Sequence, residues 1–393
     1  MKYLYILCAM FLFSCQKSID KIAPQQPRIN GEKETCSFDI SEFNMIKRPP
    51  INYDAAKGRP ITAGPKAKSG GGSTTTNTTS NVILLDFNGQ LVSGTSWNYN
   101  GDINCLPSNL TEAEQAVVFQ RIATDFNPFN IVITTDENVY NNANPYKRMR
   151  VIFTESWEWF GQAGGVSFIN SFTWGDNTPC FVFSSLLGYN VKRIAEAGSH
   201  EAGHTLGLRH QSVYDANGAK IAEYNPGQGS GEIGWAPIMG VSYSRNLSLW
   251  HNGTSSSSYT SYQNDIAIIS GVVGLVNDDY SNTTSGAAAL SSTLGGLINS
   301  SSDVDFFSIN ITGSSTVSVI PQNVGINNEG GNLDLILSVY NGQGSLIATI
   351  NDPNILSAST VLQPGSYFVS VSTSDNSNTL KYGMLSSYSI SIN

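Results

Sequence analysis

The chain has 393 residues, of which 13% are charged, and its formal net charge at pH 7 is -9. This length predicts two folded domains with flanking segments. A weakly acidic surface with few charges argues against nucleic acid as a partner, because nucleic-acid binding needs basic patches.

Residues 1–15 have the layout of an export signal. Lys2 precedes an apolar run that ends at Cys15, and this run is too short to cross a bilayer, which takes about 20 apolar residues. The segment from Leu12 to Cys15 resembles a bacterial lipobox, in which the cysteine is acylated and becomes the mature N-terminus. We therefore expect an exported lipoprotein, anchored through Cys15 to the bacterial outer membrane or cell surface. The alternative is a cleaved signal peptide and an extracellular protein.

Residues 16–80 form a polar segment that ends in a Gly/Ser/Thr-rich run starting at Ser69. Such a composition predicts a flexible linker. We interpret the whole segment as a tether or a propeptide.

Export also determines how the cysteines are interpreted, because disulfides persist outside the cytosol. Cys105 and Cys180 are expected to form a disulfide within one domain. Cys36 is then the odd cysteine.

From residue 81 the sequence is typical of a domain with both strands and helices. The apolar run 82–87 predicts a buried strand, and residues 131–135 and 149–153 predict two more. Thr111 and Glu114 form a capping-box pattern that opens a helix through about residue 125. The apolar face of that helix is predicted from Val118, Phe119, Ile122 and Phe126. This order of elements favours an α+β domain over 81–282, with a mixed sheet and helices packed on it.

Residues 200–210 read HEAGHTLGLRH and match the pattern H-E-x-x-H-x-x-G-x-x-H at every fixed position. Side chains four residues apart lie on one face of a helix, so His200 and His204 can bind one ion together. Gly207 can take the left-handed conformation, which ends the helix and brings His210 back as a third ligand. Three histidine ligands predict a zinc ion with one open position, where it holds a water and lowers its pKa towards about 7.

Glu201 follows the first histidine directly, which places its carboxylate beside the ion. We expect it to be the general base: it takes a proton from the zinc-held water as that water attacks a peptide carbonyl, and passes the proton to the leaving amine. This is the chemistry of a zinc metalloendopeptidase with protein or peptide substrates. The alternative is a cell-envelope adhesion or binding lipoprotein with a structural zinc site. The intact Glu201 favours the enzyme, because a structural site needs no base.

The motif resembles that of the metzincin clan of zinc endopeptidases, and the resemblance covers about residues 81–280. Members of the clan carry a methionine turn beneath the metal-binding imidazoles. Residues 236–240 fit this turn, with Met239 as the floor of the site.

The resemblance also implies a cleft in which an edge strand pairs with the extended substrate. Residues 164–168 look like this strand, with Gly165, Val166 and Ser167 as its substrate-binding positions. Residues 259–276 resemble the long helix that follows the methionine turn.

Several positions leave the subfamily open. Some subfamilies place a tyrosine two residues after the methionine as a switchable ligand that stabilises the oxyanion, whereas here Val241 stands there and the candidate is Tyr243. Gln211, after the third histidine, matches none of the familiar subfamilies. A cysteine upstream of such a zinc site can cap the metal as a latency switch, but the residues around Cys36 do not resemble the known switch motif.

From residue 283 the composition shifts to Ser, Gly, Asn and Val in short alternating runs. This pattern predicts an all-β module with the strand spacing of a sandwich. Residues 303–307, 332–334 and 362–367 resemble segments of the bacterial pre-peptidase C-terminal domain, and this resemblance implies a jelly-roll-like β-sandwich over 283–393. Its strands are predicted at 315–320, 333–340, 345–350 and 366–371.

Three aspartates of this module, Asp303, Asp305 and Asp334, offer the oxygen ligands that calcium prefers, but the favoured interpretation is that they are solvated turn carboxylates. The module has no histidine or cysteine to complete a metal site, so we expect 81–282 alone to carry the chemistry. We also expect a monomer. A cut near residue 282 is expected to expose little apolar surface.

Overall fold

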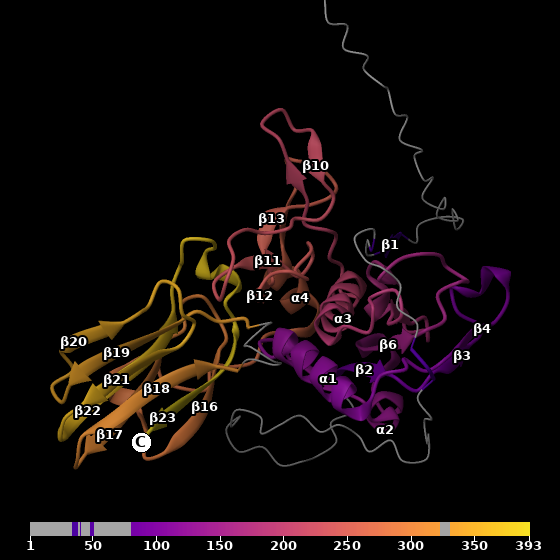
Figure 1. Cartoon of the computed structure of the whole chain (residues 1–393). Coiled ribbons are helices and arrows are strands. Elements are labelled where there is room, and N and C mark those ends of the chain that lie inside the picture. The colour runs from indigo at the N-terminus through magenta and orange to yellow at the C-terminus, as the bar shows by residue number, and fades with distance from the viewer. Residues whose placement is uncertain (1–33, 38–39, 41–47, 51–79, 323–330) are drawn as a thin grey trace, which may run out of the picture. The chain divides into compact units, whose positions relative to one another are not determined.

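The structure, a computed structural model, describes residues 34–37, 40, 48–50, 80–322 and 331–393 (Figure 1). Cys15 and the rest of the predicted export signal lie outside these residues, as does most of the predicted linker. Among the helices of the described part, none combines the length and apolar character that spanning a bilayer requires.

A mixed six-stranded sheet contains the strands predicted after residue 80. The pairs β2–β5, β2–β6 and β6–β8 are parallel, whereas β7 runs antiparallel to both β8 and β1. All residues of β2 are buried, as its continuous apolar run predicts for a strand covered on both faces. Across the sheet the order is β1 (Thr35–Ser37), β7 (Gly165–Phe168), β8 (Cys180–Phe183), β6 (Arg148–Thr154), β2 (Asn81–Asp86) and β5 (Ile131–Thr134).

The first helix begins where the capping box predicts. The Thr111 side chain accepts from Glu114 N, and the Glu114 carboxylate accepts from Thr111 N at 2.8 Å. The predicted apolar face is buried, and the helix packs against α3. α3 in turn packs on β6, β7 and β8. The α-helices of the described part are α1 (Glu112–Phe126), α2 (Glu137–Asn141), α3 (Val191–Thr205) and α4 (Asp265–Val273).

The prediction of a long helix over 259–276 is wrong for the first part of that range. Residues Tyr262–Asn264 form a strand, β14, and only Asp265–Val273 is helical. The side chain of Gln263 exchanges two hydrogen bonds with the backbone of Arg209, which holds the chain extended there. The Asn264 side chain then accepts from Ala267 N at 2.8 Å and caps the shorter helix.

Four short two-stranded sheets are described between residues 90 and 264. One of them, β11 with β12, is parallel, and the others are antiparallel. The pairs are β3 (Gln90–Val92) with β4 (Ile103–Cys105), β9 (Val213–Tyr214) with β10 (Lys220–Ala222), β11 (Trp235–Pro237) with β12 (Leu247–Leu249), and β13 (Asn252–Thr254) with β14.

The region after residue 283 consists of strands in two sheets, and the four predicted strands are observed as β18, β19, β20 and β22. Buried and partly exposed residues alternate along β19, so one face of each sheet turns to a shared core, as in a β-sandwich. One sheet has the order β15 (Ala288–Ala289), β17 (Asp305–Ile311), β22 (Gly365–Thr373), β19 (Leu335–Asn341) and β20 (Leu346–Ile350). The other has the order β16 (Thr293–Ile298), β23 (Ser386–Ile392), β18 (Ser315–Pro321) and β21 (Ala358–Leu362).

The core of these two sheets continues across residue 282. Trp235 and Leu247, from β11 and β12, belong to the same hydrophobic cluster as Phe307 of β17. In addition, Asn332 donates from Nδ2 to Asp125 Oδ1 at 2.9 Å. The expectation that a cut near residue 282 exposes little apolar surface is therefore wrong, because apolar side chains on both sides of the cut pack into one core.

The predicted disulfide between Cys105 and Cys180 is not formed in the structure, and both thiols are free and buried. Cys105 ends β4 and pairs with Gln90 in the β3–β4 hairpin. Cys180 begins β8 in the large sheet, where its thiol donates to the Arg150 carbonyl at 3.8 Å. Burial raises the pKa of Cys105 to about 12. The two cysteines lie in different sheets, which their spacing in the sequence does not reveal.

Candidate functional site

The motif histidines lie at the end of α3 and in the loop after it. The side chain of Asn190 caps the start of this helix, and its last turns, with His200 and His204, are buried. Gly207 has φ +107°, in the left-handed region that favours glycine, and there the chain leaves the helix. The ring centroids of His200 and His204 lie 4.6 Å apart, and that of His210 lies 5.2 and 4.9 Å from them. The structure thus brings the three predicted ligands together.

Each of the three imidazoles is oriented through its Nδ1 atom. The Nε2 atoms of His204 and His210 are buried and have no hydrogen-bond partner among the described residues. Burial and the neighbouring histidines hold the pKa of His200 and His204 well below the usual range, so these rings are neutral. Neutral imidazoles with an oriented Nδ1 suit a zinc ion. The Nδ1 contacts are His200 to Ile238 O at 2.8 Å, His204 to Leu208 O at 2.7 Å and His210 to Glu223 Oε1 at 2.7 Å.

Glu201 is buried between α3 and β7. Ser167 donates from Oγ to Glu201 Oε2 at 2.6 Å, whereas Oε1 has no hydrogen-bond partner among the described residues. A Cβ atom at Gly165 would lie 2.7 Å from Glu201 Cγ, so only glycine leaves room for this carboxylate. Burial raises the pKa of Glu201 well above its usual value, and the hydrogen bond from Ser167 opposes that rise. A cation among the histidines would favour the ionised carboxylate.

Met239 is fully buried in the turn that follows β11. A Cβ atom at Gly203 of α3 would meet its sulfur at 2.8 Å, so the methionine packs directly against the helix that carries the histidines. The turn is closed by a hydrogen bond from Gly240 N to Pro237 O at 3.0 Å. Gln211 N also donates to Met239 O at 2.7 Å, which ties the residue after the third histidine to the methionine turn.

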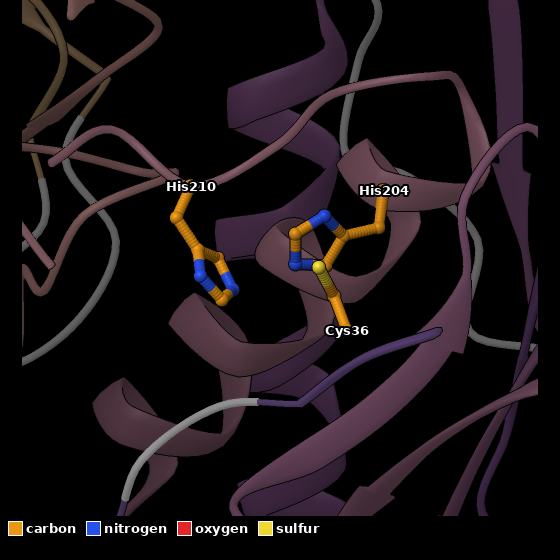
Figure 2. A group of neighbouring side chains, drawn as sticks. All are labelled: Cys36, His204 and His210. Atoms are coloured by element: carbon orange, nitrogen blue, oxygen red, sulfur yellow. The ribbon is translucent and has the colours of Figure 1, made fainter. Parts of the chain in front are cut away.

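Cys36 approaches the histidines from the N-terminal segment (Figure 2). It lies in β1, which pairs antiparallel with β7 and places Cys36 opposite Ser167. The Cys36 sulfur and one ring nitrogen each of His204 and His210 lie within 4.8 Å of one another, close enough to bind a single metal ion. Burial and the carboxylates of Glu201 and Glu34 raise the pKa of the Cys36 thiol to about 12.

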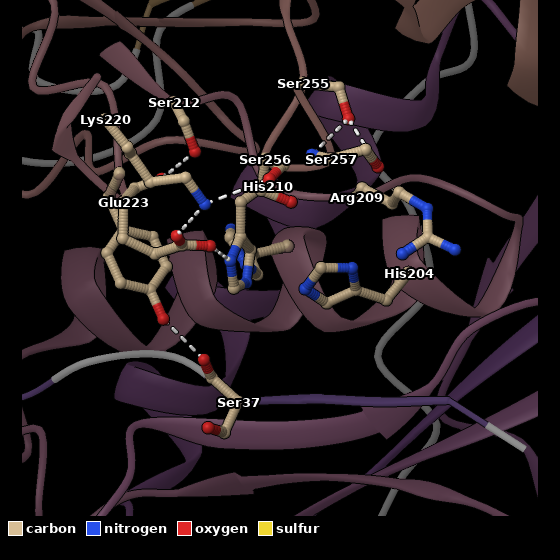
Figure 3. A network of polar contacts seen from close by, with 12 residues as sticks. Ser37, His204, Arg209, His210, Ser212, Lys220, Glu223, Ser255, Ser256 and Ser257 are labelled. Carbon is tan, nitrogen blue, oxygen red and sulfur yellow. Dashed lines mark hydrogen bonds and ion pairs between the residues drawn. The ribbon is translucent and has the colours of Figure 1, made fainter. Parts of the chain in front are cut away.

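Hydrogen bonds and an ion pair hold strand β1 at both ends. At its start, Ile169 N donates to Glu34 O at 2.9 Å, and the Glu34 carboxylate forms a two-pronged ion pair with Arg209. At its end, the Tyr224 hydroxyl donates to Ser37 O at 2.5 Å, as the dashed line to Ser37 in Figure 3 shows. The strand is thereby fixed in register along β7.

Glu223 and Tyr224 contact the third histidine, although the sequence alone gives no sign of it. Glu223 binds His210 and also accepts from Lys220 Nζ at 2.6 Å (Figure 3). Burial acts to raise the pKa of Glu223, but these two partners leave it below the usual value. The Tyr224 ring centroid lies 4.5 Å from that of His210. Burial, Glu196 and Glu201 raise the pKa of Tyr243, the tyrosine named from the sequence, well above its usual value, and its oxyanion role stays a prediction.

A second group of titratable side chains lies where the chain enters the second region. One ligand oxygen each of Asp278, Asp279 and Asp305 lies within 4.8 Å of the others. Burial, and next the neighbouring carboxylate of Asp303, raise the pKa of Asp305 to about 9. Asp334, grouped with them in the sequence analysis, instead accepts from Asn376 and has Glu232 and Asp352 as charged neighbours.

Asp279, Asp303 and Asp305 of this acidic group each have one buried carboxylate oxygen without a hydrogen-bond partner among the described residues. Tyr388 donates to Asp305 Oδ2 at 2.5 Å, and Asn299 N donates to Asp303 Oδ2 at 2.8 Å. The other oxygen of each, and Oδ2 of Asp279, is buried without a hydrogen-bond partner among the described residues. Such oxygens suit a hard cation.

Comparisons with known proteins do not place the chain in a family. No protein-family model matches it, and no curated protein matches it. Solved structures that resemble part of it include the pre-peptidase C-terminal domain of collagenase from Bacillus anthracis, with 16% identity, a TM-score of 0.20, and coverage of 30% of this chain and 100% of that one. Another is PliG from Aeromonas hydrophila, a periplasmic inhibitor of g-type lysozyme, with 16% identity, a TM-score of 0.17, and coverage of 30% and 96%. At these TM-scores neither resemblance establishes an activity for this chain.

Proposed function

We propose that this protein is a metzincin-type zinc endopeptidase in which His200, His204 and His210 hold the ion. The observation that carries the proposal is the set of three clustered imidazoles, each oriented through Nδ1, with the carboxylate of Glu201 on the same helix. An adhesion or binding lipoprotein with a structural zinc site is the second candidate. It has less support, because such a site has no use for a half-satisfied buried carboxylate.

Glu201 is the proposed general base. Zinc, when bound, supplies a Lewis acid and acidifies a water molecule. Ser167 holds one oxygen of the Glu201 carboxylate, and the backbone at Gly165 closes on its side chain. The second oxygen, Oε1, remains available to take a proton from the attacking water and to pass it to the leaving amine.

Strand β7 is the proposed substrate-binding strand, and the segment that includes β1 is the proposed inhibitory propeptide. An extended peptide that adds to an exposed sheet edge binds through main-chain hydrogen bonds. In the structure β1 takes that place beside β7. Its Cys36 lies beside His204 and His210, where a thiolate would compete for the zinc position that the reaction needs.

Two further parts of the proposal concern a second ion and the location. We propose that Asp278, Asp279 and Asp305 bind a calcium ion, because one oxygen of each lies within 4.8 Å of the others and calcium prefers oxygen ligands. Asp279 and Asp305 each also have a buried oxygen without a hydrogen-bond partner among the described residues. We also propose that the protein is an exported lipoprotein anchored through Cys15, on the sequence pattern alone.

The test uses the full chain loaded with zinc, with quenched peptides and a denatured protein as substrates. Cys36→Ala is expected to hydrolyse them about tenfold faster than the wild type, because the fourth position is freed. Adding Glu201→Gln to that variant is expected to lower kcat by about 10²–10⁴-fold, the range for loss of a general base, while one zinc per chain is still bound. Full activity without Glu201 contradicts the mechanism. Zinc binding without hydrolysis in Cys36→Ala favours the structural site instead.

A further inference from the structure

We infer that the enzyme selects substrates with an acidic residue at the position that Glu34 takes directly before β1, and that Arg209 is the residue that selects it. The inference rests on the proposed function and goes beyond it to the class of substrate. It starts from the ion pair between Glu34 and Arg209, which joins β1 to the residue directly before the third histidine.

The register of β1 makes it a stand-in for a bound peptide. Thr35, Cys36 and Ser37 lie opposite Phe168, Ser167 and Val166 of β7. Glu34 directly precedes β1, and its carbonyl accepts from Ile169 N, so the extended pairing reaches it. Side chains two residues apart in an extended chain point to the same face, so Glu34 and Cys36 both face the side where the histidines lie. A peptide that replaces β1 in this register therefore presents a side chain to Arg209 two residues before the one that faces the zinc ligands.

Main-chain contacts at both ends hold this register for any sequence. Ile169 N donates to the carbonyl of Glu34, and the Tyr224 hydroxyl donates to the carbonyl of Ser37. Every peptide has carbonyls at these places, so the two contacts align a peptide without reading its side chains. Arg209, in contrast, interacts with a side chain, so its affinity for a peptide depends on the charge of that side chain.

The chemistry at Arg209 favours a carboxylate. Both of its terminal nitrogens bind one oxygen each of Glu34, a geometry that a guanidinium offers to a carboxylate and that neither an amide nor an amine matches. The side chains of Arg209 and Glu34 are 37% and 51% exposed, so solvent weakens the pair. We therefore expect a preference of about fivefold for Glu over Gln, a larger one over Lys, and a decline of both with added salt.

The hydrolysis test uses the full chain with Cys36→Ala and Glu34→Gln, so that its own strand competes less for the cleft. Peptide mixtures are cleaved, and the products are sequenced by mass spectrometry. Glu and Asp are expected to be enriched about fivefold at one fixed position before the cleaved bond. Arg209→Gln should remove the enrichment, and Arg209→Glu should replace it with Lys and Arg. Arg48→Gln is the matched control, since Arg48 is exposed to a similar degree as Arg209 and also pairs with a glutamate, Glu114, at 2.9 Å.

A second test needs neither zinc nor turnover. In the full chain with native Cys36, the alkylation rate of this thiol reports how often β1 leaves β7. Arg209→Gln and Glu34→Gln are each expected to raise that rate about fivefold at low salt, and Arg48→Gln is not. A peptide carrying Glu should also raise it more than the same peptide carrying Gln.

The outcomes separate the two claims. If no zinc-loaded variant cleaves any peptide, the proposed function fails, whereas the alkylation test still judges the pairing of Arg209. If peptides are cleaved without an acidic preference, or the preference survives Arg209→Gln, the inference is overturned and the proposed function stands.

Discussion

The histidine cluster and the acidic group are two regions that gather buried side chains with unsatisfied atoms, but they differ in charge. His204 and His210 are oriented through Nδ1, and their Nε2 atoms are left without partners. Asp279 and Asp305 are instead like-charged neighbours whose pKa values burial raises to about 7 and about 9. A neutral imidazole can stay buried without an ion, whereas a buried carboxylate must take up a proton or a cation.

This difference in charge indicates how each region behaves when no metal ion is bound. The histidine cluster is built to keep its shape, because each ring has its own acceptor in the protein. The acidic group has no cation among the described residues to balance it, so its charge depends on pH. We expect zinc to bind to a preformed site and calcium to act mainly on stability.

The largest expected effect separates the two regions by metal. His204→Ala should lower zinc affinity by more than the roughly 100-fold that loss of an outer contact costs, because it removes a ligand. Asp305→Asn should leave zinc affinity within about twofold, because it lies outside the histidine cluster. Competition titration with a chromophoric chelator measures both. Equal losses in the two variants would mean that the regions are coupled.

A smaller effect is expected at the acceptor of the third histidine. Glu223→Ala should weaken zinc binding by about 10–100-fold, since it removes the carboxylate that orients His210 and increases its basicity. Glu223→Gln should recover part of this affinity, because an amide oxygen still accepts from Nδ1. Lys220→Ala is the control and should change affinity less, as it contacts Glu223 but not the ring. If all three variants bind zinc like the wild type, Glu223 has no orienting role.

The smallest expected effect is the pH dependence of stability in the acidic group. The folded pKa values of Asp279 and Asp305, about 7 and about 9, lie above the usual value of about 4, so the folded state keeps protons that the unfolded state releases. Their contribution to stability is therefore complete below about pH 4 and is lost as pH rises towards about 9. Calcium should raise the melting temperature by a few degrees at about pH 8 and less at about pH 5.

Calorimetry on the wild type, on Asp305→Asn and on the exposed-carboxylate control Asp352→Asn measures this effect. Only Asp305→Asn should make the melting temperature depend less on pH and on calcium. A calcium response of equal size at both pH values would contradict the assignment.

The parts of the site that depend on local order were predictable from the sequence. The motif placed two histidines one helical turn apart, and Gly207 ended the helix as its conformational freedom allows. The capping box at Thr111 likewise located α1. These signals are carried by residues within about ten positions of one another.

The contacts that were missed join distant segments. Glu34 and Arg209 are 175 residues apart, and no spacing rule links them. The disulfide prediction failed for the same reason, because Cys105 and Cys180 enter different sheets. The residues around Cys36 gave no switch pattern, since its position follows from the pairing of β1 with β7 and not from its neighbours.

Strand β1 also has a consequence for the solubility of the protein. It covers the open side of β7, a strand that is buried at every residue. If the strand leaves, a row of backbone N–H and C=O groups faces water, and a second chain can pair with it as readily as a substrate can. Chains in which β1 has left β7 should therefore associate with one another at high protein concentration. An excess of a peptide that pairs with β7 should prevent this association. The same three residues, Thr35–Ser37, would then guard against aggregation as well as against untimely hydrolysis.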